Sequence, residues 1–223
     1  MGIARVPAVT VGDRGAHGWN PPAYAALLGI PYSEAVKLPP TELAKRLDIV
    51  LDTTQQLMRI VPERHLNWRP PERNRTLRNL GYHVFRLSLA FVDAMDLGEF
   101  PDDRSKDDGR REAVGPRPSS GKSWLLDQAP DDLRDGQDIA RYGALVRGRI
   151  GGWFEGAAPS EFERVIKVYY GPQSGHDLLE RTVWHAAQHL RQLYALAERL
   201  EIAPPVPMPV DAFEGLPLPD ALW

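Results

Sequence analysis

The sequence predicts a mainly helical protein: a four-helix bundle with a small N-terminal ββα extension and a proline-rich C-terminal tail. Three observations lead to this fold class. Long stretches repeat apolar residues at spacings of three and four, which is the period of an amphipathic helix. A long stretch between the second and the third predicted helix lacks this period. Six prolines lie in residues 203–223.

Two strongly periodic segments give the first two helices. The first is predicted for residues 41–61, between Pro39-Pro40 and Pro62, since proline is tolerated at a helix start and disfavours continuation. The second is predicted for residues 77–95, and Gly98 follows as a stop. A polar connection with Trp68 and Pro70-Pro71 joins the two helices.

The third and fourth helices follow a long insertion. The third is predicted for about residues 137–154, where Gly143, Gly148 and Gly151-Gly152 loosen it. Residues 162–170 read as extended or a short strand. The fourth helix is predicted to begin near Asp177, whose side chain caps while Glu180 reaches back, and to end near Leu200. Four long helices with one long crossover favour a bundle, in which metal sites are built from facing helices.

We therefore divide the chain into three parts. Residues 1–32 form the ββα unit, which is too small to bury a core alone and must pack on another body. Residues 39–202 form the bundle, with the insertion at 99–134, whose length requires either a function or disorder. Residues 203–223 form a polyproline-like tail that we expect to lie on a surface.

Composition excludes several function classes. Lys and Arg number 27 against 30 Asp and Glu, so no net positive field favours nucleic acid. The chain has no apolar run of roughly 20 residues and no secretory signal, so we expect a cytoplasmic protein that does not enter a membrane. Cysteine is absent, which excludes disulfides, thiolate ligands and a Cys nucleophile.

Histidines are the candidate metal ligands. His185 and His189 lie four apart in the fourth helix, hence on one face, and the helical wheel places both at the edge of the apolar arc. His83 occupies a similar edge of the second helix. Three converging imidazoles suit zinc, nickel, iron or copper and leave a position for water or substrate. The alternative is that each is a half-buried histidine with a hydrogen-bonding neighbour. His17, His65 and His176 receive no role.

Other candidates have ordinary alternatives. Glu180 and Gln188 could orient an imidazole, although capping and solvation are the simpler expectations. Arg86, Arg181 and Arg191 could meet an anionic substrate but are expected to be solvated. Three aromatic residues could line a pocket or pack in the core: Trp153, Tyr170 and Trp184.

Residues 41–200 resemble the DinB-like superfamily of four-helix metal-binding proteins. The resemblance rests on Leu66-Asn67-Trp68 in the segment from Pro62 to Pro70, on Leu80-Gly81-Tyr82-His83, and on Trp184-His185-Ala186-Ala187-Gln188-His189-Leu190-Arg191-Gln192. It implies a metal triad of His83, His185 and His189. The superfamily includes thiol-dependent enzymes, among them mycothiol-dependent maleylpyruvate isomerase and bacillithiol transferases. The long insertion departs from many members.

The first 30 residues resemble the C-terminal part of a glutaredoxin. Val6-Pro7-Ala8-Val9, a turn, His17-Gly18-Trp19 and a helix carry this similarity, and Pro7 matches the proline that helps hold a glutathione-type thiol. The half with the redox cysteine is missing, so this piece cannot exchange dithiols. A structural extension is the favoured alternative.

Three functions follow. The first is a metal-dependent enzyme for thiol S-transfer or isomerisation, with zinc as the expected ion, nickel or iron as alternatives, and a low-molecular-weight thiol as cosubstrate. The second is a metal-dependent hydrolase. The third is a metal-binding or interaction module without turnover. We expect a small-molecule substrate and a homodimer; the sequence assigns no catalytic or thiol-binding residue.

Overall fold

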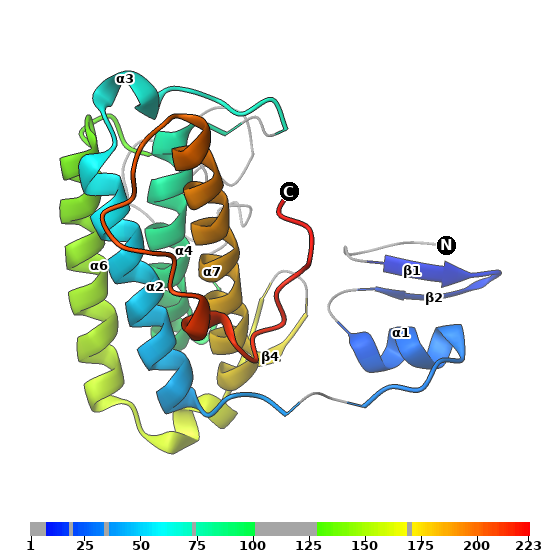
Figure 1. The fold of residues 1–223 in the computed structure, drawn as a ribbon. Coiled ribbons are helices and arrows are strands. Elements are labelled where there is room, and N and C mark those ends of the chain that lie inside the picture. The colour runs from blue at the N-terminus through cyan, green and yellow to red at the C-terminus, as the bar shows by residue number, and fades with distance from the viewer. Residues whose placement is uncertain (1–7, 18–19, 34–35, 73–74, 101–128, 169–170) are drawn as a thin grey trace.

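Four long helices form a bundle in the computed structural model, which describes residues 8–17, 20–33, 36–72, 75–100, 129–168 and 171–223 (Figure 1). They are α2 (Pro40–Ile60), α4 (Leu77–Leu97), α6 (Gly136–Gly156) and α7 (Gly175–Arg199). All four lie where the apolar period predicts them, which confirms the fold class. Within the described ranges, no helix is long and apolar enough to cross a membrane.

The helices α2 and α4 follow each other in the chain but lie at diagonally opposite corners of the bundle. Both α2 and α4 pack mainly against α6 and α7. Arg78, in the first turn of α4, donates to the carbonyl of Leu133 at 2.6 Å, just before α6 begins. Arg149, near the end of α6, contacts Asp96 near the end of α4. The start of α4 therefore lies beside the start of α6, and the last turns of the two helices also lie side by side, so α4 and α6 run parallel.

Parallel neighbours explain the long insertion. A chain that leaves one end of α4 must travel back along the bundle before it can begin a parallel helix. The predicted crossover at 99–134 is thus required by the topology. Its residues 101–128 lie outside the described part of the chain; Phe100 is held by a 2.7 Å hydrogen bond to the carbonyl of Lys167.

A side-chain cap and a glycine define the two ends of α4. Thr76 caps α4 by accepting from the N–H of Asn79 at 3.1 Å, and Gly98 ends it with φ of 75°, a left-handed conformation that favours glycine. The stop predicted at Gly98 is confirmed.

The start of α7 differs from the prediction. Ser174 is the cap residue: its hydroxyl accepts from the N–H of Asp177 at 3.0 Å, and the Asp177 carboxylate accepts from the N–H of Ser174 at 3.2 Å. The expectation that Asp177 caps with Glu180 was wrong. Gly175 explains the earlier start, since its N–H donates to the carbonyl of Arg164 at 2.9 Å and an added Cβ would meet the carbonyl oxygen of Glu161 at 2.6 Å.

The core lies between the four helices. The apolar arc predicted for α7 is buried, each residue at most 2% exposed: Leu178, Leu179, Val183, Ala186, Leu190, Leu193 and Ala197. The wheel is therefore correct, and the edge of the arc faces α4.

Short elements connect the helices. A single turn, α3 (Glu63–Leu66), which the sequence analysis did not predict, joins α2 to α4. After α6 come η1 (Pro159–Glu163) and the antiparallel pair β3 (Val165–Ile166) and β4 (Gln173–Ser174). The extended segment predicted at 162–170 is partly wrong, because residues 162–163 end η1; Val165–Ile166 within it form a strand, and Tyr170 lies outside the described residues.

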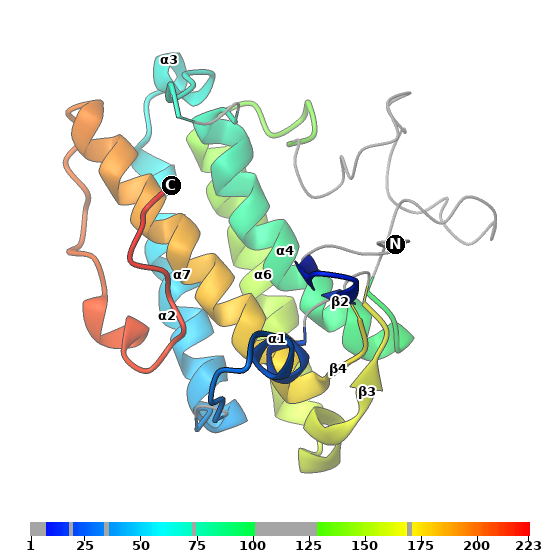
Figure 2. The same ribbon diagram turned by 90° about the vertical axis from the view of Figure 1, so that its right-hand side faces the viewer.

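The N-terminal unit has the predicted ββα order and lies beside the bundle (Figures 1 and 2). Strands β1 (Ala8–Val11) and β2 (Arg14–His17) pair antiparallel, and α1 (Pro21–Leu28) follows. Among its described residues only Ala25 is buried. Pro7, Gly18 and Trp19 lie outside the described residues, so the glutaredoxin resemblance and the boundary at residue 32 stay predictions.

The C-terminal tail runs along the bundle surface beside α7 (Figures 1 and 2). It contains a short turn, η2 (Val210–Phe213), in addition to extended backbone. Leu216 is buried at 8% exposure, and Phe213, Leu218 and Trp223 pack against the core. The tail is therefore a structural part of the bundle.

Candidate metal centre

Three histidines from two helices meet at one point. His83 comes from α4, and His185 and His189 come from successive turns of α7. One ring nitrogen from each lies within 4.8 Å of the others. The Nε2 atoms of His185 and His189 are 3.2 Å apart, and the His83 ring centre lies 5.2 Å and 4.9 Å from those of His185 and His189. The structure brings together all three predicted residues.

The cluster is mostly shielded from solvent and lies in a positive environment. His83 is 6% exposed and His189 is 9% exposed. Burial lowers the pKa of His185 well below its usual range, and the neighbouring imidazoles, Arg181 and Arg75 lower it further. His185 is therefore neutral at pH 7, the form in which an imidazole can donate its lone pair to a metal.

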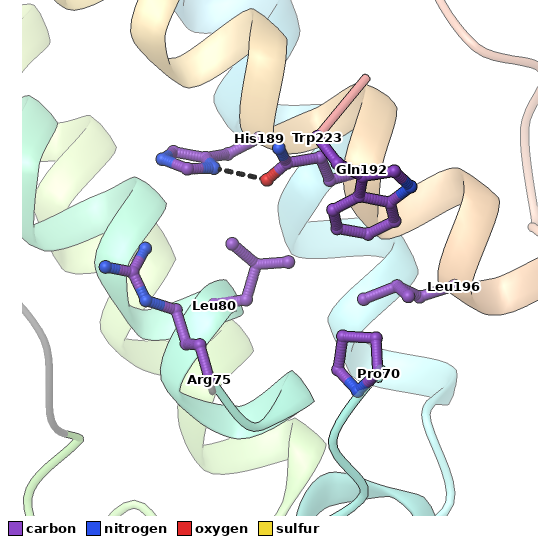
Figure 3. Close-up of a pocket in the computed structure, with 7 residues that line it drawn as sticks. All are labelled: Pro70, Arg75, Leu80, His189, Gln192, Leu196 and Trp223. Atoms are coloured by element: carbon purple, nitrogen blue, oxygen red, sulfur yellow. Dashed lines mark hydrogen bonds between the residues drawn. The ribbon is translucent and has the colours of Figure 1, made fainter. Parts of the chain in front are cut away.

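Gln192 fixes which nitrogen of His189 faces the cluster. Its Oε1 lies 2.7 Å from Nδ1 of His189 (Figure 3). An amide oxygen only accepts, so Nδ1 of the neutral imidazole donates and Nε2, the atom that faces His185, keeps its lone pair. Gln192 is 3% exposed. This role of Gln192 was not predicted from the sequence; the signal for it is the spacing of three residues from His189, which places both side chains on one face.

A pocket opens beside His189. It has a volume of about 200 Å³ and is closed on one side by the indole of Trp223 (Figure 3). Its walls combine apolar side chains with a few polar groups: Pro70, Arg75, Leu80, His189, Gln192, Leu196 and Trp223. A small apolar group with polar atoms near His189 would fit this lining.

Two other polar side chains of α7 hold the tail. The Nε2 of Gln188 donates to the carbonyls of Ala221 and Leu222 at 3.0 and 2.9 Å. Arg191 donates to the carbonyl of Pro219 at 2.8 Å. The expectation that both are solvated was wrong, because the tail covers this face of α7.

The remaining polar candidates are Arg86, Arg181 and Glu180, and each has its own surroundings in the structure. Arg86 is 6% exposed and pairs with Asp93 at 3.0 Å, so the expectation that it is solvated was also wrong. Arg181 lies 5.6 Å from the ring centre of Trp184, and both line a separate pocket together with Glu180.

The residues given no role stay outside the centre. His176 contacts the carbonyl of Leu38 at 2.8 Å, His65 lies in α3 and His17 ends β2. Trp153 packs against Phe91 and Phe154 and donates to Asp96 at 3.1 Å, so it belongs to a core cluster.

The fold and the site together define a class: a four-helix bundle in which two facing helices bring three histidines to one point. A family model described as the DinB superfamily matches residues 46–193. The chain belongs to the DinB superfamily, which confirms the resemblance stated for residues 41–200.

A solved structure has a similar fold. It is described as YfiT from Bacillus subtilis, a probable metal-dependent hydrolase with an unusual four-helix bundle topology. The two chains are 17% identical, with a TM-score of 0.54 over 78% of this chain and 94% of that chain. No curated protein matches this chain.

Proposed function

We propose that this chain is a metal-dependent enzyme whose divalent ion is held by His83, His185 and His189, and that the ion activates water for hydrolysis of a small substrate. The observation that carries the proposal is the convergence of three ring nitrogens within 4.8 Å. Catalytic zinc sites usually have three protein ligands and leave a further position open for water or substrate.

The residues around the histidines fit a bound cation. His185 is held neutral by burial, and Gln192 directs the lone pair of His189 towards His185. A divalent ion at such a site lowers the pKa of a water or thiol beside it and supplies a nucleophile at neutral pH. Zinc suits an all-imidazole site best, and nickel or iron are alternatives.

The surroundings indicate what the substrate is. Arg75 lines the pocket beside His189, and a guanidinium at a pocket wall suits an anionic group of a substrate. The pocket beside His189 would take an apolar group of that substrate. Hydrolysis is preferred over other reactions because the similar structure YfiT is described as a probable metal-dependent hydrolase.

A second candidate is thiol-dependent S-transfer or isomerisation at the same ion. It is favoured by the resemblance to thiol-dependent members of the superfamily, and the absence of cysteine requires that the thiol be a cosubstrate. The homodimer expected from the sequence remains a prediction beside either function.

Metal analysis tests the ligand set. Wild-type protein purified without a nickel column should contain about one divalent ion per chain, and His83→Ala and His185→Ala should lose it. His65→Ala is the matched control and should retain the ion. Metal retained in the first two variants would refute the ligand set, and a metal-free wild type that binds no added ion would refute the metal site.

Substrate assays separate the two reactions. Turnover of small anionic esters or amides by metal-loaded protein without thiol supports hydrolysis. Conjugation of a generic electrophile that appears only with an added thiol supports the second candidate. Metal binding without turnover in either assay would indicate a non-catalytic module and would contradict both.

A further inference from the structure

Segment 219–223 of the tail is connected to the histidine cluster by an unbroken chain of hydrogen bonds. The carbonyl oxygen of Leu222 accepts from Nε2 of Gln192 at 2.6 Å. Oε1 of the same amide accepts from Nδ1 of His189 at 2.7 Å, and Nε2 of His189 lies 3.2 Å from that of His185. One amide therefore joins the tail to a ring of the site.

The tail carbonyl determines how this amide is oriented. An amide has a donating end and an accepting end. Because the carbonyl of Leu222 can only accept a hydrogen bond, the NH₂ end of Gln192 must face this carbonyl, and the amide oxygen must face His189. Reversing the amide would place oxygen against oxygen and two N–H groups against His189. That reversed amide would favour the other tautomer, in which Nε2 is protonated and cannot bind a cation.

The tail itself is fixed against α7. Residues 188, 191 and 192 lie on one face of the helix, and their side chains donate to carbonyls of Pro219, Ala221 and Leu222 at 2.6–3.0 Å. Arg191 also donates to Oε1 of Gln188 at 2.8 Å, which orients that amide in the same sense as Gln192. Trp223 is held at the pocket wall, with the Arg199 guanidinium 5.4 Å from its ring centre.

We infer that Gln192 is a positioning residue and that tail segment 219–223 sets it: the Leu222 carbonyl orients the Gln192 amide, which holds His189 in the tautomer that presents Nε2 to the cation site. This inference rests on the proposed metal site. Its first consequence is the tautomer of the His189 imidazole, which can be tested in protein without any bound ion.

The tautomer can be read directly in the metal-free protein. Nitrogen NMR of ¹⁵N-labelled histidine distinguishes a protonated Nδ1 from a protonated Nε2. Wild-type His189 should show a protonated Nδ1. In Gln192→Leu, and in a chain ending at Leu218, His189 should show a mixture or the other form. An Nδ1-protonated His189 in both altered proteins would overturn the inference.

Metal affinity gives the second readout. Loss of such an outer hydrogen bond typically weakens metal binding by about 10- to 100-fold, which we expect for Zn²⁺ in Gln192→Leu and in the chain ending at Leu218. The two changes combined should weaken binding no more than either alone, because both break one path. Independent, multiplying losses would overturn the role of the tail.

Matched variants separate positioning from simple loss of structure. Tyr194→Phe removes another hydrogen bond to the tail, from the Tyr194 hydroxyl to the carbonyl of Val206 at 2.8 Å, but has no path to His189; its Zn²⁺ affinity should equal that of the wild type. Leu222→Ala keeps the carbonyl and should also bind normally. A tenfold loss in Tyr194→Phe would mean that the tail acts only through stability.

If Gln192→Leu does not fold, Gln192→Glu tests the same path. Its carboxylate can still accept from Nδ1 of His189 but has no N–H for Leu222, so the tautomer should persist while the tail loosens. A wild type that binds no Zn²⁺ would refute the proposed metal site, whereas unchanged Zn²⁺ affinity in Gln192→Leu would refute only the positioning role.

Discussion

Single glycines of α6 have opposite roles that the sequence does not distinguish. Gly143 is buried against the ring of Phe85, and an added Cβ would lie 2.5 Å from the nearest ring carbon. Gly148 lies on the same helix with nothing within 4 Å of an added Cβ. The first glycine permits close packing of α6 on α4, while the second only increases the freedom of the unfolded chain.

Alanine at these two positions should therefore shift stability in opposite directions. We expect Gly148→Ala to stabilise the protein by about 0.5–1 kcal/mol, because alanine has the higher helix propensity. Gly143→Ala should destabilise it by about 1–3 kcal/mol, since the Phe85 ring must move within a packed core. Urea unfolding followed by circular dichroism measures both; equal shifts would contradict the close packing.

Helix α7 depends on its first turn as well as on its apolar face. Asp177 accepts from Ser174 and pairs with Lys37, whose Nζ lies 2.6 Å from Oδ1. Burial raises the pKa of Asp177, but Lys37 and Ser174 lower it more, so the net pKa is below the usual value. The element that holds two of the three histidines thus begins at a charged carboxylate.

The contribution of Asp177 should disappear in acid. Because the pKa is lower in the folded protein than in the unfolded chain, the stabilisation is complete above the unfolded pKa of about 4 and is lost as pH falls through the folded pKa. Asp177→Asn should reduce the free energy of unfolding by about 0.5–1 kcal/mol at pH 7, since the pair is partly exposed. The difference in stability from wild type should shrink as the pH falls through the folded pKa of Asp177, which lies below its usual value; a difference independent of pH would contradict this assignment.

At the scale of the whole molecule, the two terminal extensions differ in how they join the bundle. Among the described residues, the N-terminal unit adds no side chain to the main core cluster. The tail adds Leu216 to that cluster and packs Phe213, Leu218 and Trp223 against it. The bundle therefore includes its tail but not its N-terminal unit.

Deletions should reveal this difference. A chain starting at residue 36 should keep the helical circular dichroism signal, the metal and a melting temperature within a few degrees of the full chain. A chain ending at Ile202 should melt well below it, because each buried Leu or Phe contributes about 1.5–3 kcal/mol. Equal effects of the two deletions would contradict the division.

Features that follow from a repeating apolar pattern could be predicted from the sequence, whereas contacts between residues far apart in the chain could not. The four helices and the edge position of His83, His185 and His189 follow from apolar periodicity, which needs no knowledge of neighbours. The role of Gln192 depends on the Leu222 carbonyl, a distant backbone group without any side-chain signature. The start of α7 was misplaced because Ser174 and Asp177 both begin capping patterns, and the contact of Gly175 with η1 decides between them.

The position of the three imidazoles would link binding of the proposed metal ion to folding. Their two helices, α4 and α7, are separated in the chain by the insertion at 99–134 and by the whole of α6. The proposed ion, held between them, would act as a cross-link that closes a long loop, and it would bind only the folded chain because the unfolded chain does not assemble the three rings. Each tenfold rise in free ion above its dissociation constant would then add about 1.4 kcal/mol to the free energy of unfolding, so the melting temperature should rise with the ion concentration if the proposed site binds it.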